Sequence, residues 1–234
     1  MRVLVTRPQP DAAVTARRLA LAGHEAIVDP MLIVATLPGA RLPSGDFDGV
    51  VLTSVNGARS LGERAELDQL RGLPLYAVGK RTAAAAPPGF ARVAVAGGDG
   101  AALAALLGRE VPAGARLLHV AGEERAVDLA AALAARDIAV ELFVIYRAIP
   151  ATGLSAATRA AVAGGQIDAA FHFSPRTAAT LAGHVLGAGL QPELARIRHL
   201  CFSHLVAAPL RAAGAPALVA EAPTEDALFA LLET

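Results

Sequence analysis

The chain has 234 residues, 54% of them hydrophobic and 18% charged, which excludes a disordered chain and supplies enough apolar side chain for a packed core. Its 21 basic and 21 acidic residues balance, which excludes a general attraction to nucleic acid or to an anionic membrane surface. The single cysteine excludes an internal disulfide and a metal site built from several cysteines.

The chain opens on the strand pattern MRVLVTRP, so we expect no signal peptide. No apolar run reaches the roughly 18–20 uninterrupted residues that a membrane span needs. We therefore expect a cytoplasmic protein that contacts neither membrane nor nucleic acid. Cys201, in the apolar run HLCF, is expected to be a small core residue.

The first half of the chain alternates short apolar runs with longer stretches of helical spacing. Residues 2–6 (RVLVT) predict a strand, and the next helix is expected to have an Asp11 cap and to end at Gly23. Strands that alternate with helices, and that show little polar alternation, predict α/β units with parallel sheets buried on both faces. Further extended segments are predicted at residues 25–30, 31–38, 49–54, 75–79 and 91–98, the last followed by a helix capped by Asp99.

From residue 116 the same order of elements starts again. Ser54 and Ser174, each at the point where a strand hands over to a helix, lie 120 positions apart. Four more matches follow the same order at similar offsets, which indicates two copies of one α/β unit. The matches are Arg2 with Arg116, Pro38 with Pro150, Gly79 with Ser203, and residues 102–107 with residues 227–232.

Four strand-to-helix corners are rich in hydroxyl and small residues and poor in acids. They are residues 53–57 (TSVNG), 77–82 (AVGKRT), 173–177 (FSPRT) and 202–207 (FSHLVA). Ligands of parallel α/β sheets bind where strands end and helix N-termini present free N–H groups, so these corners suit anions. The same hydroxyls would also serve as ordinary helix caps. A single corner does not separate the two roles, but two copies favour binding for the set.

Familiar catalytic and metal motifs are missing from the sequence. It has no HExxH, no Gly-x-Ser-x-Gly and no Walker loop, and we expect neither a metal nor a cofactor. His119 and His172 lie inside apolar runs and are expected in the core or at the edge of a site, whereas His204 is the histidine expected to touch a ligand. Tyr76 is expected to be buried, and Tyr146 either packs or donates a hydrogen bond.

Short motifs in a fixed order run through the chain: VLVTRP, D-x-x-x-x-TS-x-N-G, YAVG-x-x-TA, IYR-x-x-P, FSP-x-x-A and a terminal PT-x-x-AL. Their order and spacing resemble the uroporphyrinogen-III synthase family over essentially the whole length. The resemblance implies a cofactor-free lyase that takes hydroxymethylbilane, a linear tetrapyrrole with eight carboxylates. It would expel water, invert the last pyrrole ring and close the macrocycle to uroporphyrinogen III. We expect a monomer.

The resemblance also implies roles for individual residues. Tyr146, in IYR-x-x-P, matches a tyrosine that is a candidate to assist departure of the hydroxyl group. The chain departs from the family at CFSHLVAA, where a Gly-Pro-Thr-like turn is usual. The residues expected to bind substrate are Arg7, Thr53, Ser54, Asn56, Gly79, Thr82, Gly122, Ser174, Pro175, Arg176, Ser203 and His204.

The family finally implies two similar, doubly wound parallel-sheet α/β domains with helices on both faces and a cleft between them. Each domain would combine elements of both copies. We expect residues 1–35 with 153–234 in one domain and 42–143 in the other, joined by two connectors, 36–41 and 144–152. Two other functions fit tandem α/β units: a non-enzymatic two-lobed protein that binds an anionic small molecule, and a nucleotide-dependent transferase, which the lack of a full phosphate loop weakens.

Overall fold

The computed structural model describes residues 1–125 and 128–233. These form two compact units: unit 1 comprises Met1–Ile33 with Ile149–Thr234, and unit 2 comprises Val34–Ala148. None of the described helices is long and apolar enough to cross a membrane.

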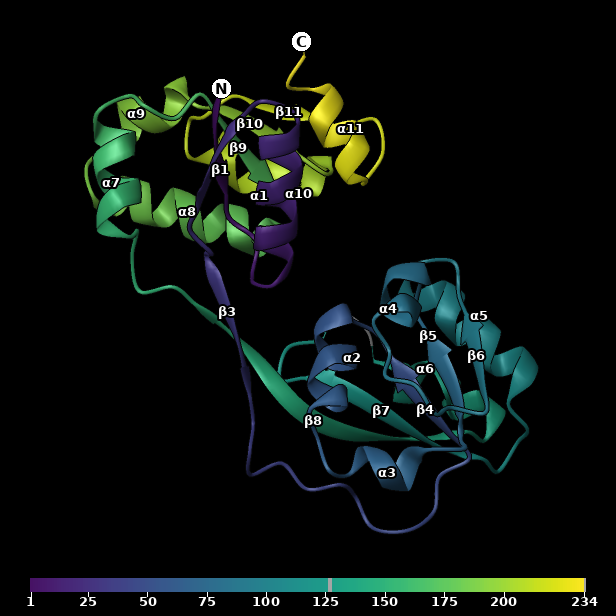
Figure 1. Cartoon of the computed structure of the whole chain (residues 1–234). Coiled ribbons are helices and arrows are strands. Elements are labelled where there is room, and N and C mark those ends of the chain that lie inside the picture. Colours follow the sequence, from purple (N-terminus) through teal and green to yellow (C-terminus); the bar gives the residue numbers. More distant parts are fainter. Residues whose placement is uncertain (126–127, 234) are drawn as a thin grey trace. The chain divides into compact units, whose positions relative to one another are not determined.

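Unit 1 is built on a five-stranded sheet in the order β11-β10-β9-β1-β2, with parallel neighbours. Strand β1 pairs with β9 although their sequences lie in different halves of the chain (Figure 1). The strands are β1 (Arg2–Val5), β2 (Glu25–Val28), β9 (Ala169–His172), β10 (Arg198–Cys201) and β11 (Ala217–Val219). The helices are α1 (Asp11–Leu21), α7 (Ala156–Ala163), α8 (Pro175–Gly187), α9 (Gln191–Arg196), α10 (His204–Ala212) and α11 (Glu225–Ala230).

Unit 2 is built on a six-stranded sheet in the order β3-β8-β7-β4-β5-β6. The pairs from β8 to β6 are parallel, so the predicted α/β fold class is confirmed in both units. The strands are β3 (Leu32–Thr36), β4 (Gly49–Leu52), β5 (Pro74–Ala77), β6 (Arg92–Val95), β7 (Arg116–Gly122) and β8 (Ala139–Pro150). The helices are α2 (Val55–Gly62), α3 (Leu67–Leu70), α4 (Lys80–Ala84), α5 (Gly100–Glu110), α6 (Leu129–Leu133) and the short 3₁₀ helix η1 (Ala134–Arg136).

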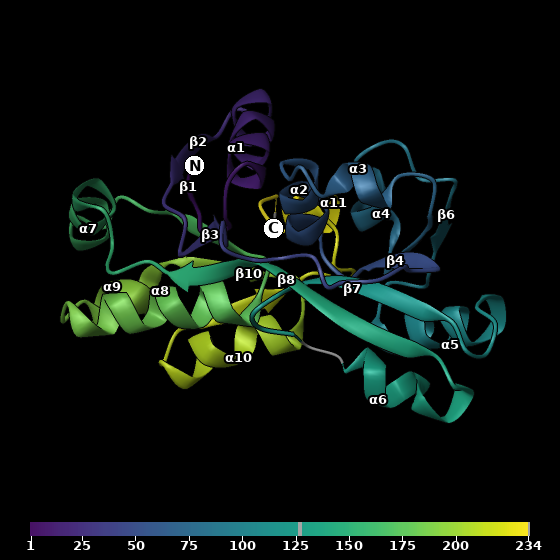
Figure 2. The same ribbon diagram turned by 90° about the horizontal axis from the view of Figure 1, so that it is seen from below.

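Helices cover both faces of each sheet, because successive strand residues point to opposite faces. In β4, Val50 and Leu52 pack in the cluster that includes α2 and α3, whereas Val51 packs with α5 and α6. Figure 2 shows α2, α3 and α4 on one side of the unit 2 sheet and α5 and α6 on the other. In unit 1, α7 to α10 pack on one face, and α1 and α11 on the other.

The two sheets share an equivalent hydrogen bond between an aspartate side chain and a backbone N–H, which supports the internal repeat. Asp168 Oδ2 accepts a hydrogen bond from the backbone N–H of Arg2 at 2.6 Å. Asp48 Oδ2 accepts from the backbone N–H of Arg116 at 2.8 Å. In each unit, an aspartate just before one strand thus satisfies the first backbone N–H of its neighbour.

One predicted helix cap is wrong and two other end signals are confirmed. Helix α1 has no side-chain cap, and Asp11 is its first residue, because the Asp11 carboxylate binds the Arg7 guanidinium instead. Gly23 ends this helix at φ +79°, with the His24 N–H donating to Leu19 O at 2.9 Å. Asp99 caps α5 by accepting from the Ala102 N–H at 2.8 Å.

Candidate active site

Tyr146 owes its position to a bulge in strand β8. The pairing of β7 with β8 is regular up to Ala121 with Val144, but Gly122 then pairs with Tyr146 and leaves Ile145 as an extra residue. In a regular strand Tyr146 and Ile145 would face opposite sides of the sheet. The bulge turns both into the cluster on the α2 side, where Tyr146 is buried.

Two glycines leave the space that the Tyr146 ring fills. A Cβ atom at Gly122 would lie 2.7 Å from Tyr146 Cζ and 3.0 Å from its hydroxyl oxygen. A Cβ atom at Gly57 would lie 3.5 Å from Cε1 of the same ring. Gly122, expected to bind substrate, therefore has a structural task that the sequence did not reveal: only glycine admits the ring so close to the strand.

Ser54 joins Tyr146 to the start of helix α2. Its Oγ caps the helix by accepting from the Gly57 N–H at 2.9 Å, and it lies 2.7 Å from the Tyr146 hydroxyl oxygen. A serine hydroxyl has one hydrogen and two lone pairs. One lone pair is used by the cap, so the hydrogen remains available for Tyr146.

Thr53 contacts a buried histidine. Its Oγ1 lies 2.9 Å from Nε2 of His119, which is 2% exposed on strand β7. Burial, helped by the nearby charge of Arg125, lowers the pKa of His119 to about 4, so the ring is uncharged at neutral pH. The sequence placed His119 either in the core or at the edge of a site, and in the structure it is buried and contacts Thr53.

A pocket of about 480 Å³ brings these groups together at the carboxyl ends of β4 to β7, and we call it the Tyr146 pocket. Acidic residues lie here too, which the acid-poor corner motifs did not predict. The pocket is lined by Thr53, Ser54, Val78, Gly98, Asp99, Gly100, Gly122, Glu124, Arg125 and Tyr146.

Three other predicted residues of unit 2 are not among the described residues that line this pocket. Gly79 precedes α4, and a Cβ atom there would lie 3.3 Å from the Cα of Gly98, which does line it. Thr82 is buried in α4, and Asn56 is half-buried in the first turn of α2.

The corners of unit 1 are built as helix caps. Ser174 caps α8 by accepting from the Thr177 N–H at 3.2 Å, with Pro175 as the first helical residue and Arg176 half-buried beside it. Ser203 caps α10, and together with the exposed His204 it borders a hollow of about 670 Å³.

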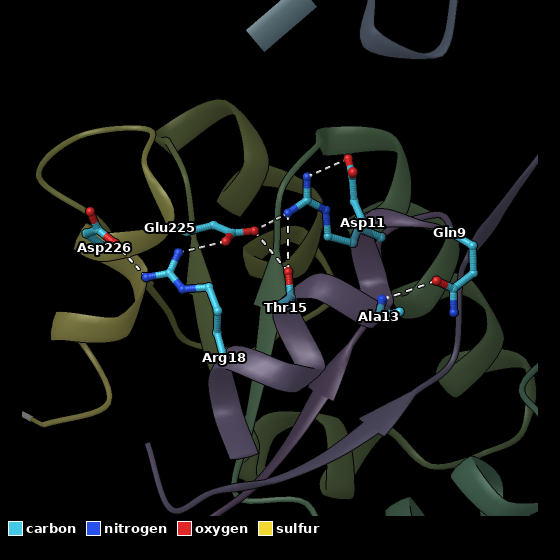
Figure 3. Close-up of polar contacts among 8 residues, drawn as sticks. Gln9, Asp11, Ala13, Thr15, Arg18, Glu225 and Asp226 are labelled. Carbon is cyan, nitrogen blue, oxygen red and sulfur yellow. Dashed lines mark hydrogen bonds and ion pairs between the residues drawn. The ribbon is translucent and has the colours of Figure 1, made fainter. Parts of the chain in front are cut away.

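Arg7 is enclosed by partners from its own unit. Its guanidinium donates to Asp11 at 2.9 Å and to Glu225, and it stacks 4.1 Å above the Phe173 ring. Figure 3 shows the Glu225 carboxylate also accepting a hydrogen bond from the Thr15 hydroxyl at 2.9 Å. Arg7 is only 6% exposed. In the structure Arg7 holds α11 against α1, and its expected role of holding a substrate carboxylate stays a prediction.

The described residues contain no group of three or more His, Cys, Asp or Glu side chains placed to hold a metal ion. Cys201 is buried, as expected, and burial raises its pKa to about 12, so the thiol is uncharged.

The chain is similar to known proteins in sequence and in structure. A family model described as uroporphyrinogen-III synthase HemD matches residues 13–230. The uroporphyrinogen-III synthetase of Helicobacter pylori has 17% identity and a TM-score of 0.62, over 100% of this chain and 99% of that one. A mutant uroporphyrinogen III synthase from the extremely thermophilic bacterium Thermus thermophilus has 18% identity and a TM-score of 0.58, over 100% and 96%.

At these identities the structural similarity shows the fold. A comparison with curated protein sequences found no match. The family model, in contrast, spans nearly the whole chain. The chain therefore belongs to the uroporphyrinogen-III synthase family, the cyclising lyases of haem biosynthesis.

Proposed function

We propose that the Tyr146 pocket is where this enzyme removes water from hydroxymethylbilane, with Tyr146 as the proton donor. The observation that carries the proposal is the 2.7 Å contact between the Ser54 and Tyr146 hydroxyls, inside a pocket and above two glycines that fix the ring. The family match supports the overall reaction, which is dehydration and cyclisation to uroporphyrinogen III with inversion of the last ring.

The direction of the Ser54 hydrogen bond matters for this role. Ser54 Oγ accepts from the Gly57 N–H and can donate its own hydrogen to the Tyr146 oxygen. The phenol hydrogen then remains free for the substrate. A hydrogen bond donated to the phenol oxygen also stabilises the phenolate that forms when the proton leaves, which makes Tyr146 a stronger acid.

Tyr146 alone can donate and take back the proton that the reaction needs. The electrons of the pyrrole nitrogen expel the hydroxyl group, and the Tyr146 proton turns it into water. Ring closure forms a carbon–carbon bond at the substituted carbon of the last ring. The bond from that carbon to the methylene of the preceding ring then breaks, and the methylene bonds instead to the unsubstituted α-carbon of the last ring, which loses one proton. The Tyr146 phenolate can accept that proton and return to its starting state.

Binding is proposed to come from the strand-to-helix corners. Thr53 and the N–H groups at the start of α2 and α5 would receive carboxylates in unit 2, and the corners at Ser174 to Arg176 and at Ser203 and His204 would do so in unit 1. With eight carboxylates to distribute, holding one reactive arrangement can contribute about 7–11 kcal/mol in favourable cases, more than a single proton donor.

Product analysis tests the function directly. The full-length protein is incubated with freshly prepared hydroxymethylbilane, the products are oxidised, and uroporphyrin isomers I and III are separated by chromatography. We expect isomer III well above the isomer I that forms spontaneously. A binding protein that does not catalyse the reaction would leave isomer I as the product, and that outcome would refute the proposal.

A further inference from the structure

The hydrogen bond between Thr53 and His119 is unusual because it uses a histidine in the middle of a buried strand. His119 pairs with Val51 of β4, and its neighbour Leu117, on the same face, belongs to the apolar cluster with α5 and α6. A polar ring is costly in such a position unless it is hydrogen-bonded. Its Nε2 atom lies 2.9 Å from the Thr53 hydroxyl oxygen, and Thr53 lines the Tyr146 pocket.

We propose that His119 is a positioning residue that donates its Nε2–H to Thr53, so that the Thr53 hydroxyl donates its own hydrogen to a carboxylate of the substrate. This inference rests on the proposed function of the Tyr146 pocket. In the opposite arrangement the Thr53 hydrogen would be given to His119, and only lone pairs would face the pocket. Lone pairs repel a carboxylate, so that arrangement would oppose binding.

The charges around the pocket explain why an oriented donor is needed. The described residues that line it include two carboxylates, Asp99 and Glu124, against one guanidinium, Arg125. General charge attraction therefore does not hold an anionic substrate there. Directed donors do, and a hydroxyl whose lone pair is already occupied by a buried histidine is a donor with a fixed direction.

Substitutions separate this role from a purely structural one. Thr53→Val and His119→Leu are each expected to raise KM about 10–100-fold, the range for one lost hydrogen bond to a charged group, with kcat little changed. The double variant should be no worse than Thr53→Val alone, since both changes remove the same interaction. His119→Gln, whose amide nitrogen can donate from a similar place, should restore most of the affinity. Thermal melting checks that each variant is folded.

Tyr76→Phe provides the matched control. It removes a side-chain hydrogen bond of the same sheet, from Arg92 to the Tyr76 hydroxyl at 2.8 Å, at a residue that does not line the pocket. Its KM should equal that of the wild type. Independent, additive effects of Thr53→Val and His119→Leu, or an unchanged KM in His119→Leu, would overturn the inference.

The position of the histidine hydrogen can also be measured without turnover. Long-range ¹H–¹⁵N correlation spectra of the full-length protein, labelled with ¹⁵N-histidine and assigned through His119→Gln, should show the hydrogen on Nε2. A hydrogen on Nδ1 would refute the relay even if His119→Leu failed to fold. If the wild type makes no isomer III while the spectra show Nε2–H, the proposed function fails and not the hydrogen-bond arrangement.

Discussion

The two units share one backbone plan but use its corners differently. The sheet of unit 1 runs β2-β1-β9-β10-β11, and the sheet of unit 2, apart from its edge strand β3, runs β8-β7-β4-β5-β6. In each series a serine caps the helix after the third strand. In unit 2 the Ser54 hydroxyl contacts Tyr146 at 2.7 Å, whereas in unit 1 the Ser174 hydroxyl contacts Thr177 of its own helix at 3.0 Å. Both serines cap a helix, and they differ in the group that faces the hydroxyl, which is a phenol in unit 2 and a threonine in unit 1.

The corners after the second strand of each series differ even more. After β1, the buried Arg7 is held by the carboxylates of Asp11 and Glu225. At the end of β7, Gly122 leaves space for the Tyr146 ring. The corner of unit 1 is filled by internal ion pairs, whereas in the corner of unit 2 a glycine leaves space for a side chain. The buried charge of Arg7 is therefore paired within unit 1, whereas the corresponding corner of unit 2 borders the Tyr146 pocket, which we propose as the site of the reaction.

Removing the hydroxyl of Tyr146 should have the largest effect. Tyr146→Phe keeps the ring above Gly122 and loses only the oxygen that contacts Ser54. We expect kcat to fall about 10²–10⁴-fold, the usual contribution of a general acid, while the enzymatic product remains isomer III. Single-turnover rates with counted isomers would check this. A folded Tyr146→Phe variant with wild-type kcat would show that the proton comes from elsewhere.

Breaking the Arg7 network should destabilise unit 1 more than an equivalent change destabilises unit 2. Glu225 accepts from Arg7, Thr15 and Arg18, and its side chain is 19% exposed. Glu225→Ala should therefore cost about 3 kcal/mol of unfolding free energy, as for other buried pairs that lose one partner. Urea denaturation with hydrogen exchange resolved by unit would measure it.

Glu141→Ala is the matched control in unit 2. Glu141 pairs with Arg116 at 2.6 Å, but its side chain is 39% exposed, so its removal should cost less than about 1 kcal/mol. Equal losses from the two substitutions would mean that the Arg7 network contributes no more than a surface ion pair.

Acid should also affect the two units unequally. In unit 1, His172 and His199 are fully buried, with 3.0 Å between His172 Nε2 and His199 Nδ1. Burial lowers the pKa of His199 to about 4 and that of His172 well below its usual 6.5. Among the described residues of unit 2, His119 is the one buried histidine, and its pKa is also about 4. The unfolded chain binds the extra protons below pH 6.5, so this stability is complete above that pH and is lost as pH falls toward 4.

The expected loss is about 1.4 kcal/mol per pH unit for each such histidine, hence about twice as steep in unit 1. Hydrogen exchange measured by unit between about pH 6.5 and about pH 5 would test this. Replacing both His172 and His199 by leucine should flatten the pH dependence of unit 1 and leave that of unit 2 as it was. Parallel slopes in the wild type would contradict the prediction.

The sequence patterns correctly predicted the features that depend on residues close together in the chain. The α/β alternation, the Asp99 cap and the Gly23 helix end follow from residues a few positions apart, and the structure confirms them. The pairing of β1 with β9 joins one copy of the repeat to the other. Only the family resemblance suggested this arrangement, because the sequence of an apolar strand does not show which strand it pairs with.

The side-chain contacts of the candidate site could not be predicted from the alternating pattern of a regular strand. A regular β8 would have turned Tyr146 away from Ser54, and a single bulge at Ile145 reverses that. The enclosure of Arg7 was equally hidden, since its partner Glu225 lies 218 positions away. The His119 contact with Thr53 spans two strands, and the sequence showed only a histidine in an apolar run.

The two cap serines should give the smallest effects and the most direct contrast between the units. Ser54→Ala and Ser174→Ala each remove a helix cap and should lower the unfolding free energy by about 1 kcal/mol. Ser54→Ala should also lower kcat, by no more than about tenfold, because Tyr146 loses one hydrogen-bond donor but keeps its own proton. Ser174→Ala should act on KM alone, and only weakly, since the backbone N–H groups at the start of α8 remain.

Steady-state kinetics paired with thermal melts would separate the effects of these two substitutions on kcat, KM and stability. If Ser174→Ala lowered kcat as much as Ser54→Ala does, the proton-donating group could not be assigned to the corner of unit 2, because the Ser174 hydroxyl has its partner in its own helix and not in a phenol.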